Sequence, residues 1–172
     1  DDLPVTLFNA DAETHGLTLE SFDLAFSRFG VMFFNNPQAA FTNIGGALKS
    51  GGRLTFVCWR ALSHNPWALI PCEAVSSVVP PPEPTDPHSP GPFAFADDAR
   101  VKGILTAAGF TDVAVDGYKL IMKNGEGDLD ACVQGILKLG PASRMLRDAD
   151  EATMAAAAEA VRDAVAPYHT GN

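Results

Sequence analysis

A strand–helix–strand succession over residues 21–59 constrains the fold more than any other feature of the chain. Residues 21–27 (SFDLAFS) form a nearly continuous apolar run, which is typical of a strand covered on both faces. Asn36-Pro37 then supplies a helix N-cap and a proline at the first helical position, and Gly51-Gly52 is expected to end that helix. Residues 53–59 (RLTFVCW) follow as a second buried strand. The succession predicts a right-handed βαβ unit with parallel strands, and therefore an α/β fold.

Shorter predicted elements flank this unit. We expect strands at residues 4–8, 111–116 and 119–123, and helices at residues 37–48, 67–79, 97–108, 129–139 and 151–166. The helix at 67–79 is expected to bury the stripe Trp67, Ile70, Ala74 and Val78. Seven of the 13 prolines fall within residues 80–92, which predicts a stiff surface loop there. A length of 172 residues suits one domain, so we expect a single domain over residues 1–172, with a loop or lid at 80–92.

Composition excludes several classes of partner. The formal net charge of −9 argues against nucleic acid or an anionic membrane as the main partner, because both require a basic face. No apolar run approaches the about 20 residues that a membrane span needs, and no signal peptide is recognisable. Three scattered cysteines fit a cytoplasmic location and are interpreted as small buried apolar residues: Cys58, Cys72 and Cys132. Four isolated histidines lack metal-ligand spacing, so no metal site is predicted.

Candidate binding residues follow the predicted strands, because ligands of parallel α/β sheets bind beyond the carboxyl ends of the strands. After residues 4–8, Asp11 offers a carboxylate to a ligand amino or hydroxyl group, and the small Ala12 lets a ring approach. A plain acidic loop is the alternative. After the next strand, Ser27 to Phe29 are expected at a pocket, whereas Phe33 and Phe34 are expected in the core.

The third strand end leads through residues 60–67 towards the proline-rich loop and Phe93-Ala94-Phe95. This segment is interpreted either as a lid over a hydrophobic substrate or as a loop without function. Gly45-Gly46 and Gly51-Gly52 do not form a dinucleotide fingerprint, because they lie inside and after a helix. No nucleophile elbow, phosphate loop or acid–base pair is readable, so the catalytic residues are unknown.

Residues 22–34 (FDLAFSRFGVMFF) and 48–54 (LKSGGRL), with AAGF at 107–110, resemble the class I S-adenosylmethionine-dependent methyltransferases. The small-molecule, type 11-like bacterial branch is the most similar. The resemblance implies a Rossmann-like doubly wound sheet, in which residues 21–27 are the fourth strand. It implies that Asp11 and Ala12 lie beside the adenine of S-adenosylmethionine. It also implies that Ser27, Arg28 and Phe29 lie beside the methionine moiety.

The resemblance further implies methyl transfer to a small, hydrophobic or aromatic acceptor, with S-adenosylhomocysteine as product and no metal. The residues expected to contact the acceptor are Met32, Trp67, Phe93 and Phe95. In this family the transfer is an in-line displacement at the sulfonium carbon, in which binding supplies proximity and orientation. No catalytic residue is therefore assigned, although His64 or His88 is a candidate for an assisting base.

The chain also departs from the family pattern. The glycine-rich loop after the first strand, the acidic residue after the second strand and the seventh strand are not found. We therefore expect an incomplete sheet that holds strands three to six, truncated at both ends. A shortened coding sequence, undescribed termini or pairing with another copy would each explain it. The alternative function is a non-catalytic fragment that self-associates through open sheet edges, as a homo-oligomer or strand-exchanged dimer.

Overall fold

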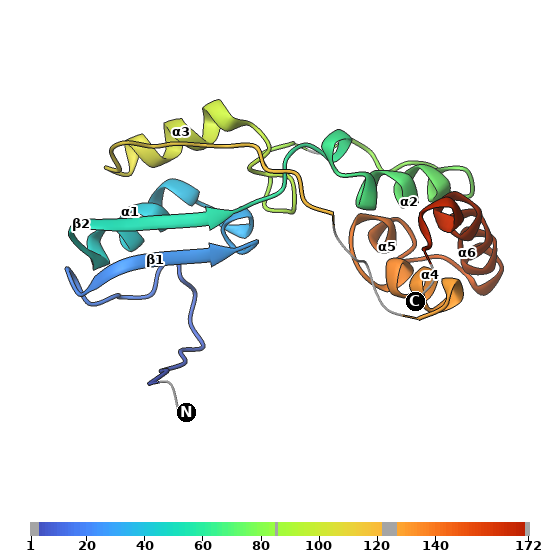
Figure 1. Ribbon diagram of the computed structural model, residues 1–172, viewed down its shortest axis with the longest axis horizontal. Helices are drawn as coiled ribbons and strands as arrows, with labels where there is room; N and C mark the ends of the chain where they lie inside the picture. Colours follow the sequence, from blue (N-terminus) through green and yellow to red (C-terminus); the bar gives the residue numbers. More distant parts are fainter. Residues whose placement is uncertain (1–3, 85, 122–126, 171–172) are drawn as a thin grey trace. The chain divides into compact units, whose positions relative to one another are not determined.

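The computed structural model describes residues 4–84, 86–121 and 127–170, and the chain forms two compact units (Figure 1). The sheet unit comprises Asp1–Arg60 and Asp86–Asp116, and the helical unit comprises Ala61–Thr85 and Gly117–Asn172. One boundary between the units falls inside the proline-rich residues 80–92. The expected single domain over residues 1–172 stays a prediction, because compactness alone does not decide whether two units fold independently.

The sheet unit contains the predicted βαβ succession. Strand β1 (Phe22–Arg28) pairs in parallel with β2 (Leu48–Val57), and helix α1 (Pro37–Ala47) connects them (Figure 1). The Asn36 side chain accepts a hydrogen bond from the Ala39 amide at 3.1 Å, as expected of an N-cap before a proline at the first helical position. The predicted α/β class is confirmed, and the strand–helix–strand unit is the part that the sequence predicted best.

Strand β2 begins earlier than predicted, because Gly51-Gly52 lies inside the strand and does not end the helix. The register shifts between the pair Phe22–Leu48 and the pair Leu24–Arg53, which marks an irregularity in the ladder. Gly51 has a φ of 78°, and a Cβ on Gly52 would lie 2.9 Å from the carbonyl oxygen of Lys49. The two glycines therefore permit a close backbone turn within the strand.

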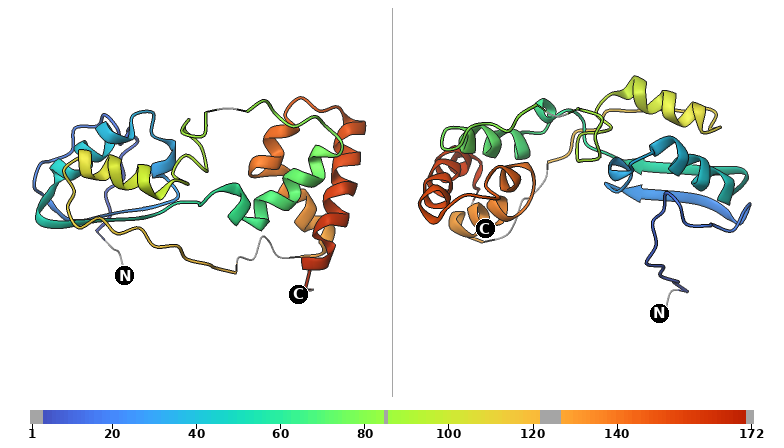
Figure 2. Two further views of the ribbon diagram at one scale, coloured as in Figure 1. Left: turned by 90° about the horizontal axis from the view of Figure 1, so that it is seen from above. Right: turned by 180° about the vertical axis from the view of Figure 1, so that it is seen from behind.

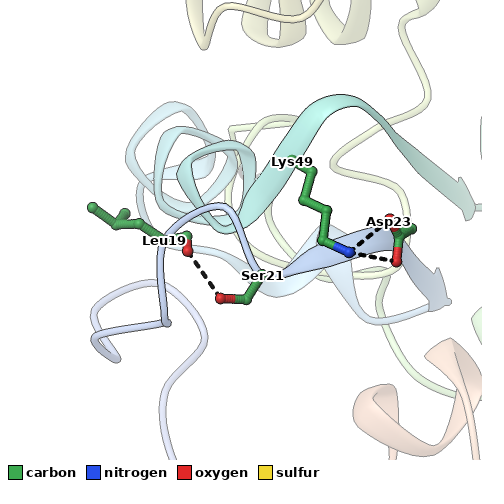
Figure 3. A network of polar contacts seen from close by, with 4 residues as sticks. All are labelled: Leu19, Ser21, Asp23 and Lys49. Atoms are coloured by element: carbon green, nitrogen blue, oxygen red, sulfur yellow. Dashed lines mark hydrogen bonds and ion pairs between the residues drawn. The ribbon is translucent and has the colours of Figure 1, made fainter.

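A surface ion pair spans this irregularity (Figure 3). Lys49 Nζ donates to both carboxylate oxygens of Asp23, at 2.9 and 3.0 Å, and so joins β2 to β1. The Ser21 hydroxyl donates to the Leu19 carbonyl just before β1. Both charged side chains are exposed, so the pair contributes little to stability and mainly fixes the local geometry.

The apolar core of the sheet unit lies on one face of the two strands (Figure 2). Helix α3 (Asp98–Ala107) and α1 share this core with the half-buried Leu54 and Phe56 of β2. The buried members of the core are Val31, Met32, Phe41, Ala94, Phe95, Val101 and Leu105. Val101 and Leu105 are the buried residues of α3, and Gly109 follows this helix with a φ of 95°.

The expected burial of the strands on both faces is wrong for the described residues. Phe26 is 78% exposed, and Phe22 and Leu24 are also exposed along β1. On β2, half-buried residues alternate with exposed ones, as in a sheet with one covered face. The apolar run at 21–27 was therefore a correct signal for a strand, but it did not show what covers that strand.

Three predicted strands do not form in the described chain. Residues 4–8 and 111–116 adopt no regular structure, and the same holds for residues 119–121 of the predicted strand at 119–123. Leu7 and Ile121 are 89% and 97% exposed. Residues 122 and 123 lie outside the described residues. A β-prone run becomes a strand only where a partner strand satisfies its backbone, so the expected sheet of four strands is a two-stranded sheet here.

The helical unit packs α2 (Pro66–Ser76), α4 (Leu129–Lys138), α5 (Pro141–Met145) and α6 (Glu151–Val165) around one core (Figure 2). Its buried residues are Val75, Val133, Leu137, Ala142, Leu146, Ala157 and Val161. Helices α4 and α6 confirm the prediction, whereas α5 lies between them in a segment for which no helix was predicted. Short 3-10 helices occur at Val31–Phe33 (η1), Leu62–His64 (η2) and Ala166–Tyr168 (η3).

Helix α2 buries a different stripe from the one predicted. Its buried residues are Ala68, Pro71 and Val75, whereas the predicted stripe of Trp67, Ile70, Ala74 and Val78 is only half-buried. The helix is apolar on most sides, so periodicity alone could not select the buried face. Among the helices of the described residues, none is both long enough and apolar enough to cross a membrane.

Candidate functional site

Two aromatic rings meet at the carboxyl edge of the sheet. Phe29 directly follows β1, and Trp59 lies two residues after the end of β2. Their ring centroids are 4.2 Å apart with an interplanar angle of 12°, which is a stacked arrangement. Both residues are half-buried. Because ligands of open α/β sheets bind outside the carboxyl ends of the strands, this pair marks the candidate site.

Phe29 adopts an unusual backbone conformation. Its φ of 57° lies in the left-handed region, which a bulky side chain rarely occupies. Its amide donates to the Val57 carbonyl at 3.0 Å, and the stack with Trp59 fixes its ring. Strained residues persist only where surrounding structure holds them, and they concentrate at functional sites.

Two other predicted cofactor residues adjoin Phe29. The guanidinium carbon of Arg28 lies 6.0 Å from the centroid of the Phe29 ring, within the range of a cation–π contact, and the Arg28 side chain is exposed. Ser27 is half-buried, and a Cβ on Gly30 would lie 3.0 Å from its hydroxyl oxygen. The absence of a side chain at Gly30 therefore leaves room for the Ser27 hydroxyl. The structure brings Ser27, Arg28 and Phe29 together at one edge, as their chain order requires.

Asp11 and Ala12 lie in an exposed turn of the sheet unit. Asp11 Oδ1 accepts a hydrogen bond from the Glu13 amide at 2.9 Å, and the Ala12 carbonyl accepts one from Asn43 Nδ2 at 3.1 Å. The Glu13 carboxylate accepts from the amides of residues 35 and 36, just before α1. The turn is thus attached to the start of α1, and one carboxylate oxygen of Asp11 is used within the turn. Cofactor binding by Asp11 and Ala12 stays a prediction.

Of the predicted acceptor residues, Met32 and Phe95 lie in the core of the sheet unit. Met32 is 1% exposed, and its Sδ accepts a hydrogen bond from the Trp59 amide at 3.3 Å. The Met32 carbonyl accepts from the Gly91 amide at 3.0 Å. Phe95 is buried and Phe93 is half-buried. Met32 therefore holds the backbone of Trp59 from within the buried core. Contact of Met32, Phe93 and Phe95 with the methyl acceptor stays a prediction.

The two phenylalanines expected in the core differ from each other. Phe33 is 47% exposed, so its predicted burial is wrong. Phe34 is half-buried and meets the buried Phe41 edge-on at 5.8 Å, in agreement with a core role. The 3-10 helix η1 turns the backbone so that Val31 and Met32 point inward, which leaves the next residue at the surface.

Trp67 and His64 belong to the helical unit, so they share no unit with the Phe29–Trp59 pair. Trp67 packs near Gly140, where a Cβ would lie 3.5 Å from its ring. His88 lies in the proline-rich loop, with Nδ1 3.7 Å from Asp86 Oδ1, and both side chains are exposed. In the part of the chain that the structure describes, no three His, Cys, Asp or Glu side chains gather into a metal-binding group.

The helical unit contains an open depression of about 340 Å³ that the sequence did not predict. It is lined by Val79, Met145, Asp148, Ala149, Asp150 and Thr153. Asp150 caps α6, and hydrogen bonds from the Thr153 side chain and backbone lower the pKa of its carboxyl group. This carboxylate is therefore engaged as a helix cap, and we assign no function to the depression.

Trp59 is the site residue that sequence reasoning missed. The available signal was its position, because an aromatic residue follows each of two adjacent parallel strands. Only the register of the sheet, which pairs Arg28 with Val57, shows that the two rings meet.

Comparison with known families identifies the segment that carries this site. Residues 1–56 match the family model described as a methyltransferase domain. This match supports a relationship of residues 1–56 to the class I methyltransferases of the type 11 branch. The methyltransferase match covers β1, α1 and all but the last residue of β2, and it confirms the resemblance of residues 22–34 over that range. No curated protein and no solved structure matches the chain.

Methyltransferase domains of this kind have a Rossmann-like α/β fold and S-adenosylmethionine as their usual cofactor. Ser27, Arg28 and Phe29 lie inside the matched range, whereas Trp59 and the helical unit lie beyond it. The residues fit the cofactor chemically. Aromatic rings favour a neighbouring cation such as a sulfonium, and the exposed Arg28 guanidinium suits an amino acid carboxylate.

Proposed function

We propose that the chain transfers a methyl group from S-adenosylmethionine to a small, hydrophobic or aromatic acceptor at the carboxyl edge of β1 and β2. The observation that carries the proposal is the methyltransferase match over residues 1–56, which ends at this edge. Ser27, Arg28 and Phe29 would hold the methionine moiety, and Asp11 and Ala12 would lie beside the adenosine.

S-adenosylmethionine would supply an electrophilic methyl carbon on its sulfonium, which an acceptor oxygen, nitrogen or carbon atom attacks in line as the carbon–sulfur bond breaks and S-adenosylhomocysteine leaves. The contribution of this chain is orientation and the exclusion of water, because well-oriented reactants need no dedicated catalytic group. Arg28 would fix the carboxylate end of the cofactor by a charge-assisted hydrogen bond. Phe29 would then place an aromatic surface near the reacting carbon, in a backbone conformation that its hydrogen bond to Val57 already fixes.

Calorimetric titration of the 172-residue protein with S-adenosylhomocysteine tests this proposal. We expect binding that Arg28→Gln weakens by about tenfold, because a hydrogen bond between charged groups contributes about 1.5–3 kcal/mol and the exposed Arg28 should lie at the lower end of that range. Arg147→Gln is the matched control, because it removes the same charge from an arginine of the helical unit. Equal weakening by both variants, or no binding by folded protein, would contradict the proposed function. Transfer of a radiolabelled methyl group to a panel of phenols and amines would then identify the acceptor.

A second candidate function is self-association through the edge of β1. The observation that favours it is the exposure of Phe22, Leu24 and Phe26 on a strand whose partner in the described chain is β2 alone. Unpaired edges of this kind promote pairing with another chain. Light scattering should then show a dimer or larger oligomer that Phe26→Lys dissociates, whereas a monomer at all concentrations would exclude this candidate.

A further inference from the structure

Trp59 is held more firmly than a surface aromatic residue requires. Its amide donates to Met32 Sδ at 3.3 Å, and Met32 is in turn fixed by the Gly91 amide at its carbonyl oxygen. The preceding residue, Cys58, approaches the Phe95 carbonyl through its Sγ at 3.9 Å. The backbone that carries the indole is therefore attached to the buried core at Trp59 itself and at the residue before it.

The indole itself is oriented by Phe29. The near-parallel stack at 4.2 Å braces Trp59 against the strained residue that ends β1. Trp59 is nevertheless only half-buried, so part of its side chain remains accessible to solvent beside the stack. A rigid, partly exposed indole costs little conformational entropy when it binds, which makes it an efficient contact for a flat ligand.

We propose that Trp59 determines acceptor specificity by stacking on a planar aromatic methyl acceptor. This inference rests on the proposed function, because it takes Ser27 to Phe29 as the cofactor side of the site. Trp59 follows the neighbouring strand and contacts Phe29 directly, so a ring stacked on the indole lies next to the residue beside the methionine moiety. Phe29 thus lies between the expected methionine moiety and Trp59, and Trp59 contacts the acceptor ring directly.

Planarity is the property that distinguishes this role from general apolar contact. Aromatic pairs in offset or edge-on geometry gain about 0.5–1.5 kcal/mol beyond the burial of area. A saturated ring of similar size buries comparable area and lacks that gain. Trp59 should therefore discriminate between a flat ring and a puckered ring that are otherwise alike.

Phenol and cyclohexanol are the matched probes for this test, because both carry one hydroxyl group on a six-membered ring. Ligand-observed NMR titrations of the full chain should give a phenol affinity about three- to tenfold higher than that of cyclohexanol. Trp59→Phe should keep most of this preference, whereas Trp59→Leu should remove it. Circular dichroism and thermal unfolding establish that each variant is folded.

Fluorescence locates the bound ring. The chain has two tryptophans, so Trp67→Phe leaves Trp59 as the single reporter. We expect phenol to quench Trp59 in that variant and to leave the emission of Trp67 unchanged in Trp59→Phe. Quenching of Trp67 alone would overturn the assignment.

Titration with S-adenosylhomocysteine separates this inference from the proposed function. The inference is supported if the Trp59→Leu variant binds S-adenosylhomocysteine normally but no longer prefers phenol, because Trp59 then acts on the acceptor and not on the cofactor. Equal phenol and cyclohexanol affinities in a parent chain that binds S-adenosylhomocysteine would overturn the inference and leave the proposed function standing. A Trp59-dependent preference for phenol without any binding of S-adenosylhomocysteine would support the aromatic site and contradict the methyltransferase proposal.

Discussion

Phe41 and Phe26 provide a direct test of which face of the sheet is covered. Phe41 of α1 is 0% exposed and lies 5.6–6.0 Å, centroid to centroid, from three other phenylalanine rings. Replacing a fully buried phenylalanine by alanine costs about 3–5 kcal/mol, because the surrounding side chains fill the cavity only in part. Phe26 is 78% exposed on β1, and the same substitution there should change stability by about 0.5 kcal/mol or less.

Urea unfolding with Trp67→Phe as the common background measures both effects. Trp59 is then the sole tryptophan, and it reports on the sheet unit that contains both phenylalanines. Since small proteins are stable by about 5–15 kcal/mol, Phe41→Ala should shift the midpoint strongly, and Phe41→Leu should shift it less. Equal losses for Phe41→Ala and Phe26→Ala would refute the reasoning, because they would mean that the exposed face of β1 is covered in solution.

Two further predictions concern the strand irregularity and a thiol. Gly52→Ala should destabilise the protein by about 1–3 kcal/mol, because the new Cβ would lie 2.9 Å from the Lys49 carbonyl oxygen. The control Gly103→Ala, at an open site in α3, should be neutral or stabilising. Equal urea midpoints for the two variants would contradict this prediction. Burial, and secondarily the charge of Asp98, raises the pKa of the Cys58 thiol. The protonated thiol therefore contributes to the stability of the fold below the pKa that Cys58 has in the unfolded chain. This contribution is lost as the pH rises through the higher pKa of the folded protein. Alkylation of Cys58 by iodoacetamide, followed by mass spectrometry, should therefore require a higher pH than alkylation of glutathione, and superimposable pH profiles would show that the thiol is not desolvated.

Local sequence signals predicted the helices well. The Asn36-Pro37 start of α1 and the positions of α3, α4 and α6 follow from caps and periodicity that involve neighbours along the chain. Each helical hydrogen bond joins residues four positions apart, so the residues that determine a helix lie within the helix and at its two ends. The motif at residues 22–34 likewise located Ser27 to Phe29 at a strand end, because that placement depends only on chain order.

Features that depend on distant partners were not predictable in this way. Residues 4–8 and 111–116 have β-prone sequences, yet they form no strand in the described structure, because a strand requires hydrogen bonds from another segment. The same dependence explains why Gly51-Gly52 lies within β2 and why the outer face of β1 is exposed.

The candidate site shows both contributions. The sequence by itself determined a parallel strand–helix–strand unit and the residues that follow β1, through local caps, apolar runs and a recognisable motif. Only the tertiary structure brought Trp59 onto Phe29 and placed Met32 behind it as a buried support. These contacts join residues about 30 positions apart, and their existence depends on the register of β1 against β2, which no local pattern encodes.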